Sequence, residues 1–245
     1  MQEVEINYSN APIILAMIQF RFNEITDFNK EQIKLIAEKI KKKYPIINER
    51  FIQGIIVDDN KKQTSVSLDE RKLDAIQVMS ENRKEYFTIA NNKFTFQSHE
   101  KYSDWNSFTE FVKVFWGLFS DYYKIDEMNG ISLRYVNKFK LPLSTKDITK
   151  YFNTYLQDNE NTHTIREFQF KYNSFDEVNG YNVIIGHALE RPIEDYLPYI
   201  YDIDVISLQN IQNNKDVWSK FNEIRNKKNH IFNNGITEEA KKLIR

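Results

Sequence analysis

Two aspartates lie two residues apart in the stretch Tyr201-Asp202-Ile203-Asp204. If this stretch is a strand, both carboxylates point to the same face, because side chains alternate along a strand. A carboxylate pair can hold Mg²⁺ or Mn²⁺, as at sites of metal-dependent nucleotide chemistry. The structural alternative is that Asp202 and Asp204 face water or pair with Lys and Arg side chains of a neighbouring strand.

A second set of candidates is Arg134, Asn137 and Lys138, in another alternating stretch. Arg134 and Lys138 are four residues apart and therefore share a strand face, together with Lys140. Such a row could bind a small anionic ligand or a nucleic-acid backbone. Cross-strand pairing with acidic residues, such as the aspartate pair above, is the structural alternative.

The third set lies in the string R-N-K-K-N-H over residues 225–230. Histidine can act as an acid or a base, and arginine can hold a phosphate. The spelling R-N-x-x-x-H resembles the catalytic motif of the HEPN ribonucleases, and that resemblance would make Arg225 and His230 the catalytic residues of a metal-independent ribonuclease. HEPN domains are all-helical, whereas this chain is rich in strand patterns. A basic, solvated helix face is the structural alternative.

Common catalytic classes lack their motifs in this sequence. Only 6 glycines are present, and neither G-x-G-x-x-G nor the P-loop pattern occurs. No G-x-S-x-G stretch exists, and the absence of cysteine removes thiolate nucleophiles and thiolate zinc sites. None of the 4 histidines has the spacing of H-E-x-x-H. We therefore expect no cofactor, and a protein that binds rather than catalyses.

Hydrophobic periodicity predicts the elements that position these residues. Strand patterns occur at 12–22, 51–57, 64–68, 75–79, 86–90, 93–97, 130–141, 164–171, 181–189 and 199–207, with Asn91-Asn92 as a hairpin turn. Helical spacing occurs at 30–44, 104–124 and 215–233, in a helix from Ser144 or Thr145 to Leu156, and in a short last helix capped by Thr237. Gly235 fits the left-handed position that follows a helix.

The order of these elements predicts an α+β fold. Runs of strands between isolated helices favour antiparallel sheets with helices on one face. Pro142 ends one strand and a helix signal follows it, which divides the chain into an N-terminal half, 1–142, and a C-terminal half, 143–245, that ends in a long helix. We expect two tightly packed halves, each a mainly antiparallel sheet with helices on one face.

Composition narrows the class of partner. Aromatic residues make up 14% of the chain, which argues against intrinsic disorder. Lys and Arg number 34 against 35 Asp and Glu, so nucleic acid is possible but not favoured by net charge. No apolar run is long enough to span a bilayer, and the acidic start lacks the features of a signal peptide. With no cysteine present, we expect a cytoplasmic protein without membrane contact.

Several ordered stretches together resemble a sporadically distributed family of prokaryotic proteins of similar length, whose activity is not settled. The residues that carry the resemblance are Tyr8-Ser9-Asn10-Ala11-Pro12, Phe20-Arg21-Phe22, the run 130–137, Tyr201-Asp202-Ile203-Asp204 and the tail from Trp218 to Thr237. Patchy distribution is typical of mobile or defence-linked genes. The resemblance therefore implies an accessory role, such as phage defence or a toxin–antitoxin function.

The leading functional hypothesis is a non-enzymatic binding or regulatory protein that acts through a protein partner or a small anionic ligand. It rests on the lack of a complete catalytic motif. The alternatives are the ribonuclease that uses Arg225 and His230, and metal-dependent nucleotide chemistry at Asp202 and Asp204.

Overall fold

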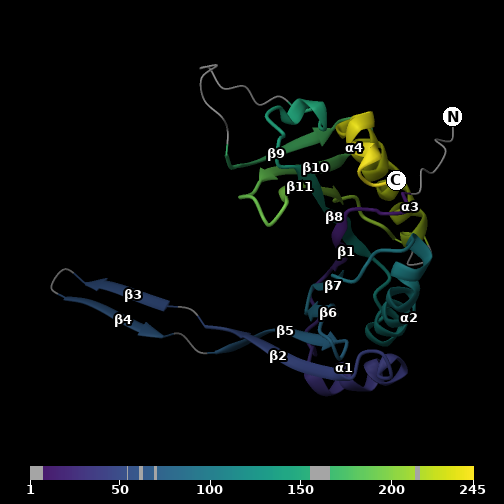
Figure 1. Ribbon diagram of the computed structural model, residues 1–245. Coiled ribbons are helices and arrows are strands. Elements are labelled where there is room, and N and C mark those ends of the chain that lie inside the picture. Colours follow the sequence, from purple (N-terminus) through teal and green to yellow (C-terminus); the bar gives the residue numbers. More distant parts are fainter. Residues whose placement is uncertain (1–7, 54, 61–62, 69–70, 155–165, 213–215) are drawn as a thin grey trace.

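Nine strands of the computed structural model form one antiparallel sheet, in the order β2-β5-β6-β7-β1-β8-β11-β10-β9 (Figure 1). The structure describes residues 8–53, 55–60, 63–68, 71–154, 166–212 and 216–245. The sheet strands are β1 (Ile13–Phe22), β2 (Ile46–Ile52), β5 (Lys72–Met79), β6 (Glu85–Ala90), β7 (Lys93–Ser98), β8 (Met128–Pro142), β9 (Phe168–Asp176), β10 (Tyr181–Leu189) and β11 (Tyr196–Ser207). A separate hairpin is formed by β3 (Ile55–Asn60) and β4 (Gln63–Leu68).

The described helices are α1 (Lys30–Ala37), α2 (Trp105–Tyr123), α3 (Val217–Gly235) and α4 (Glu238–Lys242), with short 3-10 turns at Glu38–Ile40 and Ile148–Lys150. All four lie on one side of the sheet (Figure 1). Side chains start three of them: Asn29, Asp104 and Thr237 each accept a hydrogen bond from a backbone N–H in the first turn. Among the described helices, none has both the length and the apolar character needed to cross a membrane.

The prediction of two separate packed halves is wrong, although the broader α+β prediction holds. β8, the last strand of the first segment, pairs with β1 on one side and with β11 on the other. The two segments therefore share one hydrogen-bonded layer. The helix signal after Pro142 suggested a new unit, but the pairing of β8 with β11 joins residues far apart in sequence, and periodicity carries no information on such contacts.

The helix predicted from Ser144 or Thr145 is also wrong over its described part, where only a 3-10 turn forms. Phe152 instead forms a bridge with Ile236, and Thr237 donates its backbone N–H to the Tyr151 carbonyl at 2.9 Å. The Phe152 ring stacks on Tyr199 of β11 with a centroid distance of 3.8 Å. Tertiary packing thus overrides the helical spacing. Residues 155–165 lie outside the described part of the chain.

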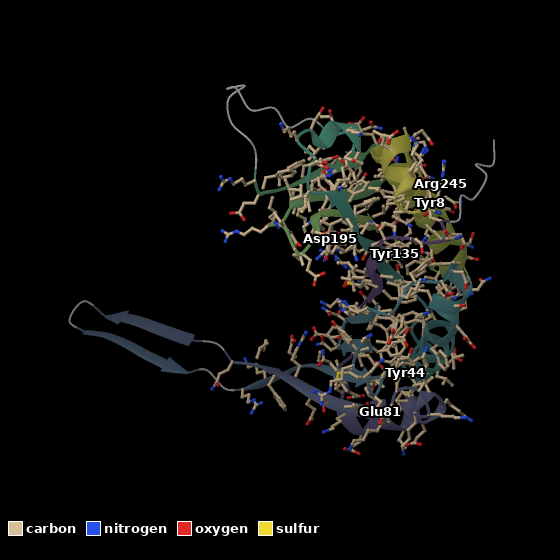
Figure 2. The ribbon with its side chains drawn as sticks, in the orientation of Figure 1. Tyr8, Tyr44, Glu81, Tyr135, Asp195 and Arg245 are labelled. Atoms are coloured by element: carbon tan, nitrogen blue, oxygen red, sulfur yellow. The ribbon has the colours of Figure 1, made fainter. Side chains whose placement is uncertain are left out.

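Aromatic packing between the sheet and the helices joins the two segments. Phe20 of β1 stacks on Trp116 of α2 at 4.0 Å and meets Phe221 of α3 edge to face at 4.9 Å. All three rings are buried. Figure 2 shows the buried Tyr135 near the middle of the sheet and the buried Tyr44 nearer the end that carries β2 and β5. Burial of each such ring contributes about 1.5–3 kcal/mol to folding, so this layer is the main source of cohesion.

The opposite face of the sheet carries no helix and is concave. The sheet curves so that β9, β10 and β11 bound this face at one end, while the β2–β5 ribbon and the β3–β4 hairpin project beyond the other (Figure 1). A row of uncharged polar side chains crosses it through direct cross-strand pairs, from Ser132 through Gln19, Thr95 and Thr88 to Gln77. This row is therefore polar, although four of its five side chains are buried.

Gly235 corrects one prediction in detail. It is the last residue of α3 and does not adopt a left-handed conformation. A glycine is required at this position because there is no room for a side chain. A Cβ atom there would overlap the Tyr201 hydroxyl and lie 2.7 Å from the ring carbon that carries it. That hydroxyl donates to the Ile231 carbonyl at 3.2 Å, so Tyr201 cannot easily move aside.

Gly235→Ala should therefore lower the free energy of unfolding by about 1–3 kcal/mol, because it overpacks the contact between α3 and Tyr201. Gly117→Ala, inside α2 with open space around the position, is the matched control and should stabilise by up to about 1 kcal/mol. Urea denaturation measures both. A destabilising effect of equal size at the two positions would contradict the steric explanation.

Candidate functional site

Arg134 and Asp202 form the central ion pair of the concave face. Arg134 donates to both carboxylate oxygens of Asp202, from Nε at 2.8 Å and from Nη2 at 2.6 Å. Asp204 lies directly opposite Arg134 in the register of β11 and β8. The two aspartates share a face, and Asp202 forms the cross-strand ion pair with Arg134 that was the structural alternative; the metal-site hypothesis stays an untested prediction. Within the described residues, no group of three or more potential metal-ligating side chains is present.

Asp204 lies beside this ion pair, and one of its carboxylate oxygens is not satisfied by the residues that the structure describes. Its Oδ1 atom is buried and has no hydrogen-bond partner among the described residues. Burial raises the pKa of the Asp204 carboxyl to about 6, and Asp202 adds to that effect, whereas Arg134, Lys171 and Arg21 act in the opposite direction. Three cations therefore surround a carboxyl group that gains a proton near pH 6.

Arg21 and Lys93 form a second feature of the same face. They are direct cross-strand partners on β1 and β7, and both are half-buried. With the Gln19 amide oriented so that its oxygen faces Arg21, that oxygen accepts from the Arg21 Nε at 3.1 Å and from Nη2 at 3.3 Å. Neither cation has a carboxylate within ion-pair distance among the described residues; Glu24, close by in sequence, accepts from Asn91 instead. Like charges directly opposite one another are destabilising by about 0.2–1 kcal/mol.

The other predicted ligand-binding residues are occupied within the protein. Lys138 pairs with Glu190 at 3.3 Å on the concave face, and Lys140 stands over the Tyr196 ring at 4.8 Å. Asn137 lies on the opposite face, where it is buried and donates to the Tyr201 carbonyl at 2.9 Å. Arg134 and Lys138 therefore share a face that Asn137 does not, as the odd spacing from Arg134 requires.

The residues of the ribonuclease hypothesis point in different directions. Arg225 stands over the Trp105 ring at 5.4 Å, whereas His230 is exposed and contacts the Asn234 amide at 2.8 Å. Five positions along a helix separate them by about 140°. Within one chain they do not form a joint site, and the ribonuclease reading stays an untested prediction.

Lys228 is the buried member of that string, and sequence reasoning missed it. It is 6% exposed, and its ammonium lies 3.8 Å from the centre of the Tyr135 ring. Burial lowers the pKa of Lys228 to about 7, and the nearby charge of Arg225 adds to this effect. The helical stripe through Phe221 and Ile224 also passes position 228, which was the available signal.

The sequence signal for Arg21 and Lys93 was weaker. In the strand pattern 12–22, Arg21 falls on the face opposite Phe20 and Phe22, and Lys93 begins the second strand of the predicted hairpin. Only the register of β1 against β7 places the two side by side. That register is a property of the sheet and not of either strand.

A scan against protein-family models found no match, and a search of curated proteins found no significant relative. The functional interpretation therefore rests on the geometry of the site.

Asp204→Asn should stabilise the protein at pH 7 but not at pH 4. The pKa of Asp204 is raised in the folded state from 3.8 to about 6, so the folded protein binds a proton between these values that the unfolded chain does not. Wild-type stability then falls as the pH rises from 4 to 6, by up to about 1.4 kcal/mol per unit. Urea denaturation of both proteins across this range should show the advantage of the variant growing and then levelling off. An advantage independent of pH would contradict the burial argument.

Lys228→Met should remove a pH dependence of opposite sign. The folded pKa is lowered from 10.5 to about 7, so between these values the unfolded chain binds a proton that the folded protein lacks. Wild-type stability should rise with pH relative to the variant, by about 1.4 kcal/mol per unit from pH 7.5 to 9.5. Guanidinium titrations at several pH values measure this slope. Parallel stability curves for the two proteins would show that Lys228 is not desolvated.

Proposed function

We propose that this chain is a non-enzymatic binding protein that captures an anionic group on the concave face of its sheet, between Arg21 and Lys93. The observation that carries this proposal is the direct cross-strand pairing of two half-buried cations with no carboxylate partner among the described residues. A phosphate or a carboxylate placed between them would replace repulsion by two charge-assisted contacts.

The surrounding charges support an anion as the ligand. Arg134 and Lys138 are neutralised by Asp202 and Glu190. Among the described residues of this face, Arg21, Lys93, Lys140 and Lys171 have no carboxylate within ion-pair distance, and the nearby Asp204 has its pKa raised to about 6. The local balance is therefore positive although the whole chain carries a net charge of -1. Such segregation attracts anionic ligands to one face.

A binding role fits these groups better than catalysis. The ion pair of Arg134 and Asp202 engages both carboxylate oxygens, which makes this aspartate a weaker base and a weaker metal ligand than a free carboxylate. A regulatory role in an accessory system such as phage defence or a toxin–antitoxin pair stays a prediction. In such a role, the anionic group would be the signal or the docking point of a partner.

Isothermal titration calorimetry with tripolyphosphate and with citrate tests the proposal and separates phosphate from carboxylate recognition. Wild-type protein should bind at least one probe. Arg21→Gln and Lys93→Gln should each weaken binding about tenfold or more, because a hydrogen bond to a charged group contributes about 1.5–3 kcal/mol. Asp204→Asn should strengthen binding at pH 7.5, because it removes a nearby negative charge.

Lys140→Gln is the matched control, because Lys140 lies on the same face but stands over Tyr196. Its affinity for the probes should equal that of the wild type. Absence of binding of both probes to the wild type, or equal losses in the Lys140 and Arg21 variants, would refute the assignment.

A further inference from the structure

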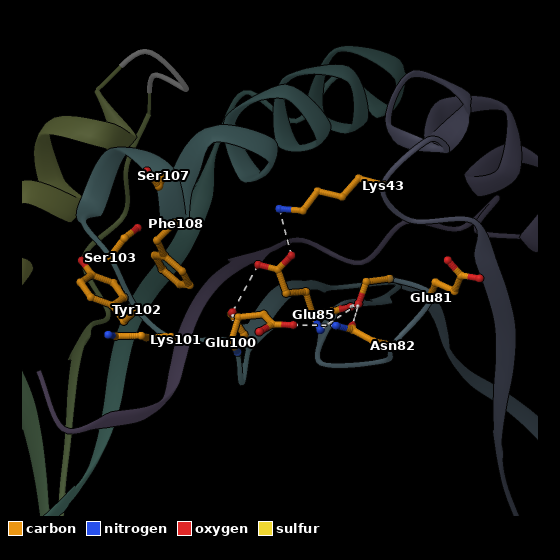
Figure 3. Close-up of a pocket in the computed structure, with 12 residues that line it drawn as sticks. Lys43, Glu81, Asn82, Glu85, Glu100, Lys101, Tyr102, Ser103, Ser107 and Phe108 are labelled. Carbon is orange, nitrogen blue, oxygen red and sulfur yellow. Dashed lines mark hydrogen bonds and ion pairs between the residues drawn. The ribbon is translucent and has the colours of Figure 1, made fainter. Parts of the chain in front are cut away.

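A polar pocket of about 670 Å³ lies away from the concave-face cluster, where the turn after β5, the end of β7 and the start of α2 meet (Figure 3). Its volume falls in the range of small-molecule sites, about 300–1,000 Å³. Three glutamates and two lysines line it, among hydroxyl groups and the rings of Tyr102 and Phe108. Which of these charges are already neutralised decides what the pocket can bind.

Glu85 lines the pocket, and both of its carboxylate oxygens already have partners within the protein. Its Oε2 atom is 2.9 Å from the Lys43 ammonium and accepts from the Tyr44 hydroxyl at 3.3 Å. Its Oε1 atom accepts from the Ser98 hydroxyl at 3.3 Å. The side chain is only 14% exposed. The charges of Glu85 and Lys43 therefore neutralise one another, and their contacts fix this part of the pocket lining.

Glu100 is engaged as well. It accepts from the Asn82 amide at 2.6 Å and lies 3.8 Å from the Lys84 ammonium. Among the lining charges that the structure describes, this leaves Glu81 and Lys101, which are exposed and have no hydrogen bond or ion pair. Figure 3 shows them at opposite ends of the pocket, with Lys101 beside Tyr102 and Glu81 beyond Asn82.

We infer that this pocket binds a small zwitterion with its charges at opposite ends, namely a short peptide with free termini. The peptide ammonium pairs with Glu81 and its carboxylate pairs with Lys101. The intervening Ser80, Ser98 and Ser107 hydroxyls already donate within the protein, so toward a peptide they can serve as acceptors for its backbone N–H groups. An α-amino acid is disfavoured because its ammonium and carboxylate are bonded to the same carbon, so it cannot extend between charges at opposite ends of the pocket.

Calorimetric titration with triglycine, N-acetyl-triglycine, triglycine amide and glycine tests this assignment. Triglycine should bind, and blocking either terminus should weaken binding at least about tenfold, since each block removes a charge-assisted contact. Glu81→Lys and Lys101→Glu should each cause a similar loss. Glu177→Lys and Lys146→Glu are the controls at exposed positions outside the pocket and should leave the affinity unchanged.

The double variant Glu81→Lys/Lys101→Glu makes the sharpest distinction. A zwitterion can reverse its direction, so the double reversal should restore triglycine binding to within a few-fold of the wild type. No detectable triglycine binding up to about 10 mM, equal affinity for the blocked peptides, or failure of the double reversal to restore binding would each overturn the proposal. The test is independent of Arg21 and Lys93, so its failure leaves the anion site on the concave face unaffected.

Discussion

Phe20 lies on the central strand of the sheet, with its ring 4.0 Å from Trp116 of one helix and 4.9 Å from Phe221 of another. These two helices belong to the two segments of the chain that β8 and β11 join by backbone pairing. Because one buried ring contacts both, the helices form a single layer over a single sheet. The concave face is the side of the sheet that this helix layer leaves uncovered (Figure 1).

Because the helices cover only one side of the sheet, charged side chains gather on the uncovered concave side. On the helix side, Asn137 donates to a backbone carbonyl and Lys228 is held over the Tyr135 ring, whereas the buried Ser207 hydroxyl has no partner among the described residues. On the concave side, cations and carboxylates interleave across neighbouring strands, and Arg21 faces Lys93. Arg21 and Lys93 are partly buried on this face, and a partly buried charge raises the free energy of the folded state unless it is paired. A ligand of opposite charge is the simplest way to meet that cost.

Sequence patterns worked where the structure is local. The strand 181–189 was predicted with the bounds that β10 has, and the helix 104–124 differs from α2 by one residue at each end. Sequence patterns gave wrong predictions where contacts with residues far away in the sequence set the backbone conformation. The segment after Pro142 has helical spacing, but Phe152 packs on Tyr199 and pairs with Ile236, so its backbone follows those contacts. Gly235 was assigned to a helix-ending conformation, whereas the Tyr201 ring is what excludes a larger residue.

The sequence by itself determined the α+β class, the alternation that places Asp202 and Asp204 on one face, and the lack of the common catalytic motifs. It also raised the pairing of Arg134 with that acidic strand as an alternative. Tertiary structure alone decided that the two segments share one sheet, that Arg21 meets Lys93, and that Glu81 and Lys101 are left unpaired at one pocket. The physical reason is that periodicity fixes which way a side chain points from its own strand or helix. Register and strand order fix what it meets, and they depend on contacts between residues far apart in the chain.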